Sequence, residues 1–481
     1  MAQKSFREEY ESIGVFLILE LLALVGFGLG GVNLIFQYAG FVVAIIATLF
    51  AFKNYSKEDL VPILTIGIPL FVIALFTSFG HFFDGYLTPV ARIGAFLGIL
   101  SFFVVGLSAR RMKSFNIKNA LYCLGGGLAL ITLISTIITW SQYGWFYPLI
   151  HKNAGSYYYD GNLYSILKEM SWLNGFKVSE VAQNYGGLFA LLCAAFLPAL
   201  LFIDYKEDKK SFIIFSVIGG IGAISMISIP NFWAIGFYAL AFGVALFYRF
   251  LRNNEKAIKV VHYGFLVACG MVVVFIFFAY LNVSVDGVAN AIKGSKLLDR
   301  IFNGNRIMYI ANPVLQASVK PTNLFGIYHG ANYSVGGYVL PDYAVASTSG
   351  AFEVELLKEG GLFAFLALLA LMVFVFNAFA RYLRYSKDKD YVKVILLTFV
   401  VGFTLYSTIC TEVFPFTHLV DTYQPFSQSL PFYLVLFVIG FIVLPKGKEE
   451  IVYIKEEVKK EVKVDPNDDY AFSDVEEEEI I

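Results

Sequence analysis

Charged residues are scarce in this sequence. They make up 15% of its 481 residues, against about a quarter in ordinary soluble domains. Hydrophobic residues make up 58%, a larger share than in ordinary soluble domains. The composition therefore excludes an ordinary soluble enzyme, and we expect an integral membrane protein that crosses the bilayer many times.

Cysteine and several common catalytic motifs are also lacking. The four cysteines, Cys123, Cys193, Cys269 and Cys410, all lie in apolar runs, so no external disulfide framework is expected. The sequence has no HExxH motif, no paired cysteines and no Walker-type phosphate loop. We therefore expect no metal and no cofactor. We also expect no nucleic-acid partner.

Apolar runs long enough to cross a membrane recur along the chain. A spanning helix needs about 20 mostly apolar residues, and runs of this kind predict twelve spans. They lie near residues 13–29, 32–52, 60–79, 89–108, 118–140, 184–203, 211–229, 232–250, 259–281, 360–380, 391–411 and 428–445. The predicted fold is an all-α integral membrane protein, with a single polytopic membrane domain over residues 1–445.

The remaining residues, 446–481, differ in composition from the rest of the chain. They carry six lysines against thirteen acidic residues and end in DPNDDYAFSDVEEEEII. A high net charge with few apolar groups is typical of a disordered segment. We interpret this segment as an acidic, solvated cytoplasmic tail, with a partner-binding segment as the alternative.

Lysine and arginine follow every second predicted span. They gather near residues 4–7, 53–57, 110–118, 206–210, 249–259 and 381–393. Basic residues in short connections stay on the cytoplasmic side, so we expect both termini to be cytoplasmic. The alternate connections then face outward.

Two of the outward connections are long, at about residues 141–183 and 282–349. Loops of this length are usually functional or disordered. Their many tyrosine, tryptophan and apolar side chains favour short helices that lie on the outer membrane surface.

The larger outward loop carries basic residues on the side where they are disfavoured. Its cations are Lys293, Lys296, Arg300, Arg306 and Lys320. They either pair with the acids of the loop and with lipid headgroups, or they bind an anionic substrate. In an enzyme that acts on a lipid outside the membrane, the fitting anion is a diphosphate, which arginine grips with a planar fork.

Three segments carry a resemblance to a known family. They are residues 305–330, NRIMYIANPVLQASVKPTNLFGIYHG, residues 347–366, STSGAFEVELLKEGGLFAFL, and residues 184–198, NYGGLFALLCAAFLP. In order and position they resemble the arginine-led segment of the large outer loop, and the beginnings of the spans after the two long loops, in Wzy-type polysaccharide polymerases and O-antigen ligases.

The resemblance implies a glycosyltransferase of GT-C-like multispan architecture in the bacterial cytoplasmic membrane. It implies metal-independent polymerisation of oligosaccharide repeats carried on undecaprenyl diphosphate, as donor and as acceptor, with a chain-length co-polymerase as a partner. The product would be an O-antigen, a capsule or an exopolysaccharide. The alternatives are a ligase-type transferase and a twelve-span flippase. The ligases carry a histidine-led motif at the position of Gly350, and its absence here favours the polymerase.

The resemblance also implies a role for the cations of the loop. Arg306 is expected to stabilise the charge that develops on the diphosphate leaving group, supported by Arg300, Lys320 or Lys177. Lys177 is the substitute for an arginine that the family carries in the smaller outer loop. Asn305, next to Arg306, is expected to contact the substrate.

A general base would take the proton of the acceptor hydroxyl. The outward candidates are His329, Asp342, Glu353, Glu355 and His418. We place Glu353 and His329 first, although an acid in the first turn of a predicted helix also suits the helix dipole. Glu359, further along the same helix, is expected to contact the substrate or to pair with a neighbouring cation.

Overall fold

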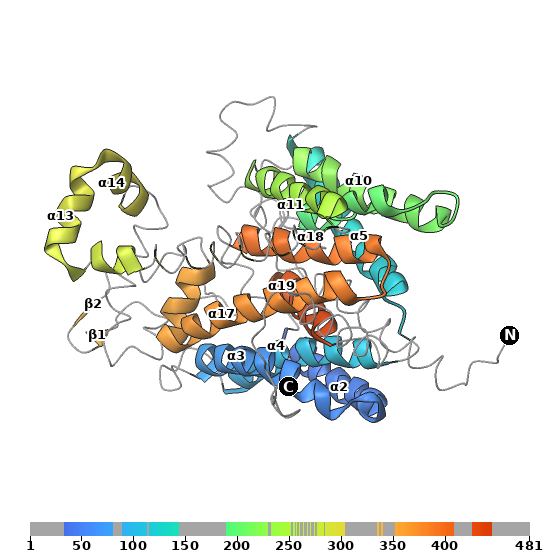
Figure 1. Cartoon of the computed structure of the whole chain (residues 1–481), viewed down its shortest axis with the longest axis horizontal. Coiled ribbons are helices and arrows are strands. Elements are labelled where there is room, and N and C mark those ends of the chain that lie inside the picture. Colours follow the sequence, from blue (N-terminus) through green and yellow to red (C-terminus); the bar gives the residue numbers. More distant parts are fainter. Residues whose placement is uncertain are drawn as a thin grey trace, which may run out of the picture.

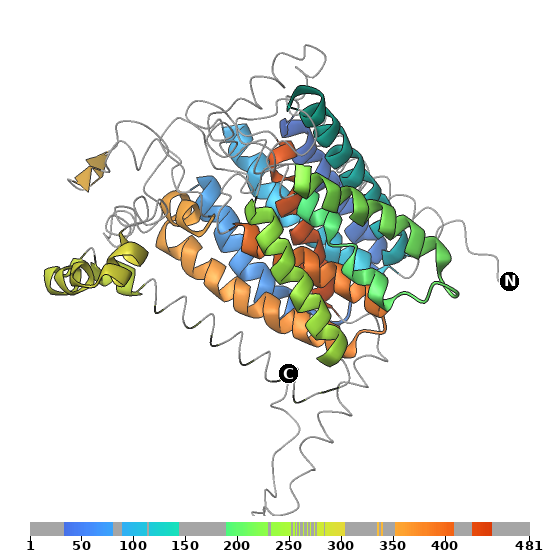
Figure 2. The ribbon, with the colours of Figure 1, turned by 90° about the horizontal axis from the view of Figure 1, so that it is seen from above.

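The computed structural model describes ten stretches of the chain and scattered positions between 254 and 282. The stretches are residues 33–79, 89–112, 115–143, 189–228, 232–251, 284–303, 334–335, 338–339, 352–407 and 426–444. The long elements are α2 (Asn33–Ala51), α3 (Leu60–Phe79), α4 (Pro89–Arg111), α5 (Ile117–Tyr143), α10 (Lys209–Ser228), α11 (Phe232–Leu251), α17 (Phe352–Tyr385), α18 (Asp390–Ser407) and α19 (Phe426–Val443). Figures 1 and 2 show these helices gathered in one bundle.

The short elements lie at the two ends of this bundle. They are η1 (Phe52–Asn54), η2 (Lys57–Asp59), η4 (Pro198–Phe202), α13 (Asp286–Gly294), α14 (Lys296–Phe302), β1 (Ser334–Val335) and β2 (Tyr338–Val339). In Figure 1, α13, α14, β1 and β2 lie at the left-hand end, beside the beginning of α17. We call this the loop end.

Within the described part of the chain, four helical stretches are long and apolar enough to cross a membrane. They are Lys57–Phe79, Ile117–Ile134, Lys209–Ile227 and Gly360–Tyr385. Shorter apolar helices cover Gly40–Asn54, Phe189–Phe202, Ala234–Arg249 and Leu434–Val443. Many large apolar side chains on these helices are exposed, including Leu49 at 69% and Ile68 at 57%. Exposed apolar surface of this extent suits a lipid environment, and together with the candidate spans it indicates a helical membrane protein.

Helices lie at the positions of the predicted apolar runs wherever those runs are described. The run at 60–79 coincides with α3, and the run at 89–108 continues to Arg111 as α4. The run at 360–380 belongs to a longer helix, α17. The first run, 13–29, and the acidic segment 446–481 lie outside the described residues.

The predicted run at 184–203 is not one regular helix in its described part. Helix covers residues 189–194, a turn follows, and η4 begins at Pro198. Proline has no N–H group to donate to the carbonyl four residues earlier. The backbone hydrogen bonds here join residues three apart instead of four, as in the bond from Leu197 N to Ala194 O at 3.0 Å. The proline therefore converts the end of this segment into a 3₁₀ turn.

The larger predicted loop, 282–349, contains both helix and strand. The expected short helices are present as α13 and α14, while the antiparallel pair β1–β2 was not expected. The sequence between the strands is Gly336–Gly337, a dipeptide that two-residue hairpin connections favour. Asn282 Nδ2 donates to Asn303 Oδ1 at 2.9 Å, which ties the residue after α14 to the helical residues 277–282 that come before α13.

Helix α4 packs backbone to backbone against α19. A Cβ atom on Gly106 would lie 2.2 Å from the carbonyl oxygen of Phe437, and one on Gly440 would lie 2.2 Å from that of Phe103. Helices in membranes approach this closely where small residues face each other. The glycines therefore set the separation of the two helices, and Phe102 and Phe441 are buried around them.

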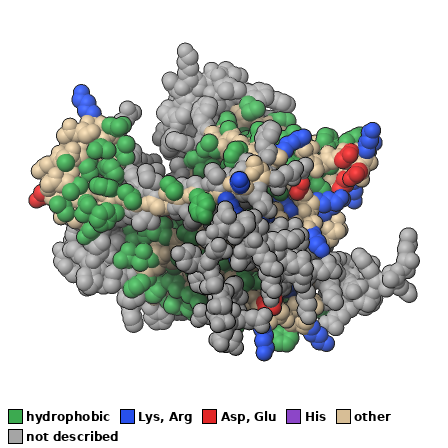
Figure 3. Space-filling model, in the orientation of Figure 1, with side chains coloured by type: hydrophobic (Ala, Val, Ile, Leu, Met, Phe, Trp, Pro, Cys, Tyr) green, Lys and Arg blue, Asp and Glu red, His purple; other side chains and the backbone are tan. Residues whose placement is uncertain are grey.

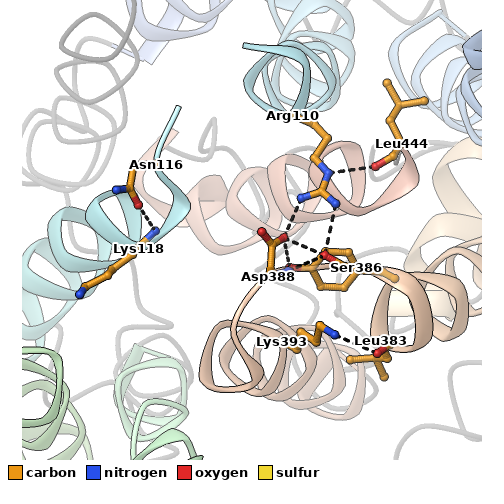
Figure 4. A network of polar contacts seen from close by, with 9 residues as sticks. Arg110, Asn116, Lys118, Leu383, Ser386, Asp388, Lys393 and Leu444 are labelled. Atoms are coloured by element: carbon orange, nitrogen blue, oxygen red, sulfur yellow. Dashed lines mark hydrogen bonds and ion pairs between the residues drawn. The ribbon is translucent and has the colours of Figure 1, made fainter. Parts of the chain in front are cut away.

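The basic connections meet at the other end of the bundle, which we call the basic end. Arg110, at the end of α4, donates from Nη1 to Asp388 Oδ2 at 2.6 Å, and from Nε to Leu444 O at 3.0 Å (Figure 4). Arg111 pairs with Asp59. These contacts join the connections after the second, fourth and tenth predicted spans to the end of the twelfth.

The connection after the sixth predicted span is tied to the same end. Lys118 Nζ donates to Asp208 Oδ2 at 2.6 Å, and Tyr391 donates to the same oxygen at 3.2 Å. Burial alone would raise the pKa of Asp208, but hydrogen bonds from Lys118 and Ser211 lower it to about 2. Figure 3 shows charged side chains gathered on the right-hand side, over the turn between η4 and α10.

We expect Gly106→Ala to destabilise the fold, because its methyl group would overlap the backbone of α19. Overpacking of this kind costs about 1–3 kcal/mol. The matched control is Gly126→Ala in α5, where an added Cβ meets nothing within 4 Å. The measurement is the thermal unfolding midpoint of the purified protein in detergent. Equal midpoints for the two variants would contradict the close packing.

Candidate functional site

Helix α17 is broken near its beginning, at the loop end. Gly361 has φ 72° and ψ −170°, a backbone conformation that residues with a Cβ rarely adopt. Figure 1 shows the part before this residue as a short segment turned steeply away from the long part of α17. The glycine therefore separates a short helix, residues 352–360, from the candidate span Gly360–Tyr385.

The end of α3 holds the break in place. A Cβ atom on Gly360 would lie 3.0 Å from Thr77 Cγ2, so the two helices touch here. The rings of Phe76 and Phe363 stack with centroids 5.8 Å apart. The Thr77 hydroxyl is engaged within its own helix, where it donates to Ile73 O at 2.6 Å. The break between the turned segment and the long part of α17 thus packs against the end of α3.

Glu353 lies in the first turn of this segment and is partly buried. Burial raises the pKa of its carboxyl group from 4.5 to about 7. Leu356 and Leu357, in the next turn, are buried at 0% and 3% exposure, so the segment packs on the protein. A carboxyl group with a pKa near 7 is populated in both protonation states at neutral pH, as a general acid or base requires.

The structure places only part of the predicted site. Arg306, Asn305, Lys320, His329 and Lys177 all lie outside the described residues. The backbone of Arg300 lies in α14, and that of Glu359 lies in α17 two residues before the break. The side chains of both also lie outside the described residues.

The described parts of the predicted site share the loop end. In Figures 1 and 2, α14, which carries Arg300, lies at the same end of the bundle as the turned segment of α17, which carries Glu353 and Glu359. Helix α14 ends at Phe302, four residues before Arg306, and Asn303 N donates to Asp299 O at 2.8 Å. The described part of this loop therefore ends at Asn303, three residues before Arg306 in the sequence.

Sequence reasoning missed the polar cluster at the basic end. It used Arg110 and Arg111 only as markers of orientation, whereas both are buried and paired with carboxylates. The available signal was the position of Asp59 and Asp388, acids within otherwise basic connections. Among the described residues, no three histidine, cysteine or acidic side chains gather in a way that could hold a metal ion.

No known protein family, curated protein or solved structure matches this chain.

We expect the stability of the protein to depend on the ionisation of Glu353. Its folded pKa is raised above the unfolded value, so its stabilising contribution is complete below pH 4.5 and is lost as the pH rises through about 7. Glu353→Gln should therefore unfold at a higher temperature than the parent chain at pH 8, and this advantage should disappear at pH 4.

The control for this measurement is Glu207→Gln, which removes an exposed carboxylate at the basic end. Thermal unfolding in detergent at pH 4, 6 and 8 gives the comparison. If the difference between Glu353→Gln and the parent is the same at every pH, the carboxyl group does not titrate near neutrality.

Proposed function

We propose that this chain polymerises oligosaccharide repeats carried on undecaprenyl diphosphate, at the outer face of the bacterial cytoplasmic membrane. The observation that carries the proposal is the carboxyl group of Glu353, with its pKa of about 7, at the beginning of a turned helix. That helix lies within residues 347–366, which resemble the corresponding segment of Wzy-type polymerases. Titratable groups with shifted pKa values are concentrated at functional sites.

The proposed topology has twelve spans, a GT-C-like arrangement and cytoplasmic termini. It is supported by the contacts of Arg110, Arg111 and Lys118, which join alternate connections at one end of the bundle. Those connections are the ones rich in lysine and arginine, as expected on the cytoplasmic side. The loop end, with Glu353, would then face outward.

The proposed reaction transfers a growing glycan from its lipid diphosphate to a second lipid-linked repeat. An acceptor hydroxyl oxygen attacks the anomeric carbon of the donor, and the bond from that carbon to the diphosphate oxygen breaks. The hydroxyl proton passes to the Glu353 carboxylate, with His329 as the other candidate base. Undecaprenyl diphosphate leaves with the bonding electron pair.

The remaining predicted residues bind and orient the substrates. Arg306 would stabilise the negative charge that grows on the leaving diphosphate, because a guanidinium group can donate two parallel hydrogen bonds to it. Arg300, Lys320 and Lys177 would add positive charge around the same group. Asn305 and Glu359 would contact the sugars and place the acceptor hydroxyl.

The proposal predicts the length of the glycan that cells make. Cells without the gene, or with Glu353→Gln or Arg306→Ala, should carry single repeats where the parent gives a ladder on a gel. Arg306→Lys should restore the ladder only weakly, since lysine cannot form the bidentate contact. Loss of a general base reduces the rate by about 10²–10⁴-fold.

The matched controls are Glu207→Gln and Lys206→Ala, exposed charges at the basic end, at equal protein levels. Both should leave the ladder unchanged. Two outcomes would overturn the proposal. A ladder that persists without attachment to its final acceptor indicates a ligase, and repeats trapped on the cytoplasmic side indicate a flippase.

A further inference from the structure

A cavity of about 470 Å³ lies between the beginning of α3 and the last turns of α17. These two helices run side by side in Figures 1 and 2. The cavity is at the basic end, because α3 begins and α17 ends there, and it is separate from the Glu353 segment at the loop end. Thr65 lines it from α3, and Phe374, Asn377, Arg381 and Arg384 line it from α17.

Positive charge dominates the polar part of this cavity. Lys259 joins Arg381 and Arg384 in the lining, and none of the described lining residues is acidic. Arg381 is exposed, and among the described residues it has no ion-pair or hydrogen-bond partner. The guanidinium group of Arg384 stacks over the ring of Tyr385, with 4.9 Å between its central carbon and the ring centroid. An anion that enters the cavity therefore meets three cations.

The cavity lies at the ends of two candidate spans. Lys57–Phe79 contributes its first turns and Gly360–Tyr385 its last turns. Arginine and lysine at the end of a span extend their side chains toward the headgroup layer. The cations of the cavity are therefore placed to meet phosphate groups of the membrane rather than the bulk solvent alone.

Apolar side chains also line the cavity, and neighbouring positions of α3 carry exposed apolar side chains. Pro62 and Ile66 from α3 and Phe374 from α17 form its apolar side. Leu64 and Ile68, on the same helix, are exposed at 45% and 57%. A free phosphate ion would bury none of this apolar surface, whereas the acyl chain of a lipid would remove it from contact with water.

We propose that this cavity binds the phosphate-bearing headgroup of an anionic membrane lipid in the leaflet at the basic end. Arg381, Arg384 and Lys259 hold the phosphate oxygens, and the Asn377 amide can donate a further hydrogen bond. The acyl chain lies along α3. The bound lipid would fix the contact between α3 and α17 at the end opposite Glu353.

The test uses the full chain, purified and incorporated into nanodiscs of zwitterionic phosphatidylcholine. Phosphatidylglycerol is added as the anionic probe, and native mass spectrometry counts the lipids retained after release from the disc. The double variant Arg381→Gln with Arg384→Gln should weaken retention roughly tenfold or more, because each cation near the membrane surface adds to the attraction. The control, Lys53→Gln with Lys206→Gln, removes two exposed cations at the same end and should retain the lipid.

Three outcomes would overturn the proposal. They are equal retention by the double variant and the control, equal retention of an uncharged diacylglycerol probe, and displacement of the lipid by millimolar inorganic phosphate alone. The last would indicate a site for free phosphate. If the double variant does not fold, Arg381→Gln alone is used, since Arg381 is exposed; it should still weaken retention, and unchanged retention contradicts the proposal.

Discussion

The ion pair between Arg110 and Asp388 is the contact on which the arrangement of the bundle depends. Both side chains are almost fully buried, at 1% and 4% exposure, and a buried charge is strongly destabilising unless it is paired and hydrogen-bonded. Arg110 meets that requirement with bonds to Asp388, Ser386 and the carbonyl of Leu444. Removing either partner would leave a buried charge without its counter-charge.

This contact determines where α17 lies. Asp388 belongs to the connection between α17 and α18, so the ion pair fixes the end of α17 against α4. At the loop end, α17 rests on α3 through Gly360 and the stacked rings of Phe76 and Phe363. A helix held at both ends carries Glu353 at a defined place. At the basic end, α3 and α17 form the walls of the cavity.

Much of the fold could be predicted from the sequence because membrane helices have a length fixed by the bilayer. The apolar runs at 60–79 and 89–108 correspond to α3 and α4, and the predicted and observed boundaries agree within a few residues. The break at Pro198 and the strands β1 and β2 were not predicted, since both depend on local hydrogen bonding within otherwise apolar or loop-like sequence. The pairing of Arg110 with Asp388 joins residues far apart in the chain, and no local pattern distinguishes it from the other basic connections.

The candidate site could be predicted only in part. The position of Glu353 at the beginning of a helix followed from the sequence, but its raised pKa follows from burial, which depends on neighbours that pattern reasoning does not place. The break at Gly361 could not be predicted from the sequence either, because a glycine within an apolar helix is usually tolerated without a positive φ. The roles of Arg306 and His329 remain predictions from the sequence.

The most direct test of the account is the length of the product that the purified chain makes in proteoliposomes. The vesicles contain single repeats on undecaprenyl diphosphate, taken from cells that lack the gene. The account predicts lipid-linked products of two or more repeats, with one undecaprenyl diphosphate released for each bond formed. Single repeats that cross the bilayer without any increase in length would contradict it.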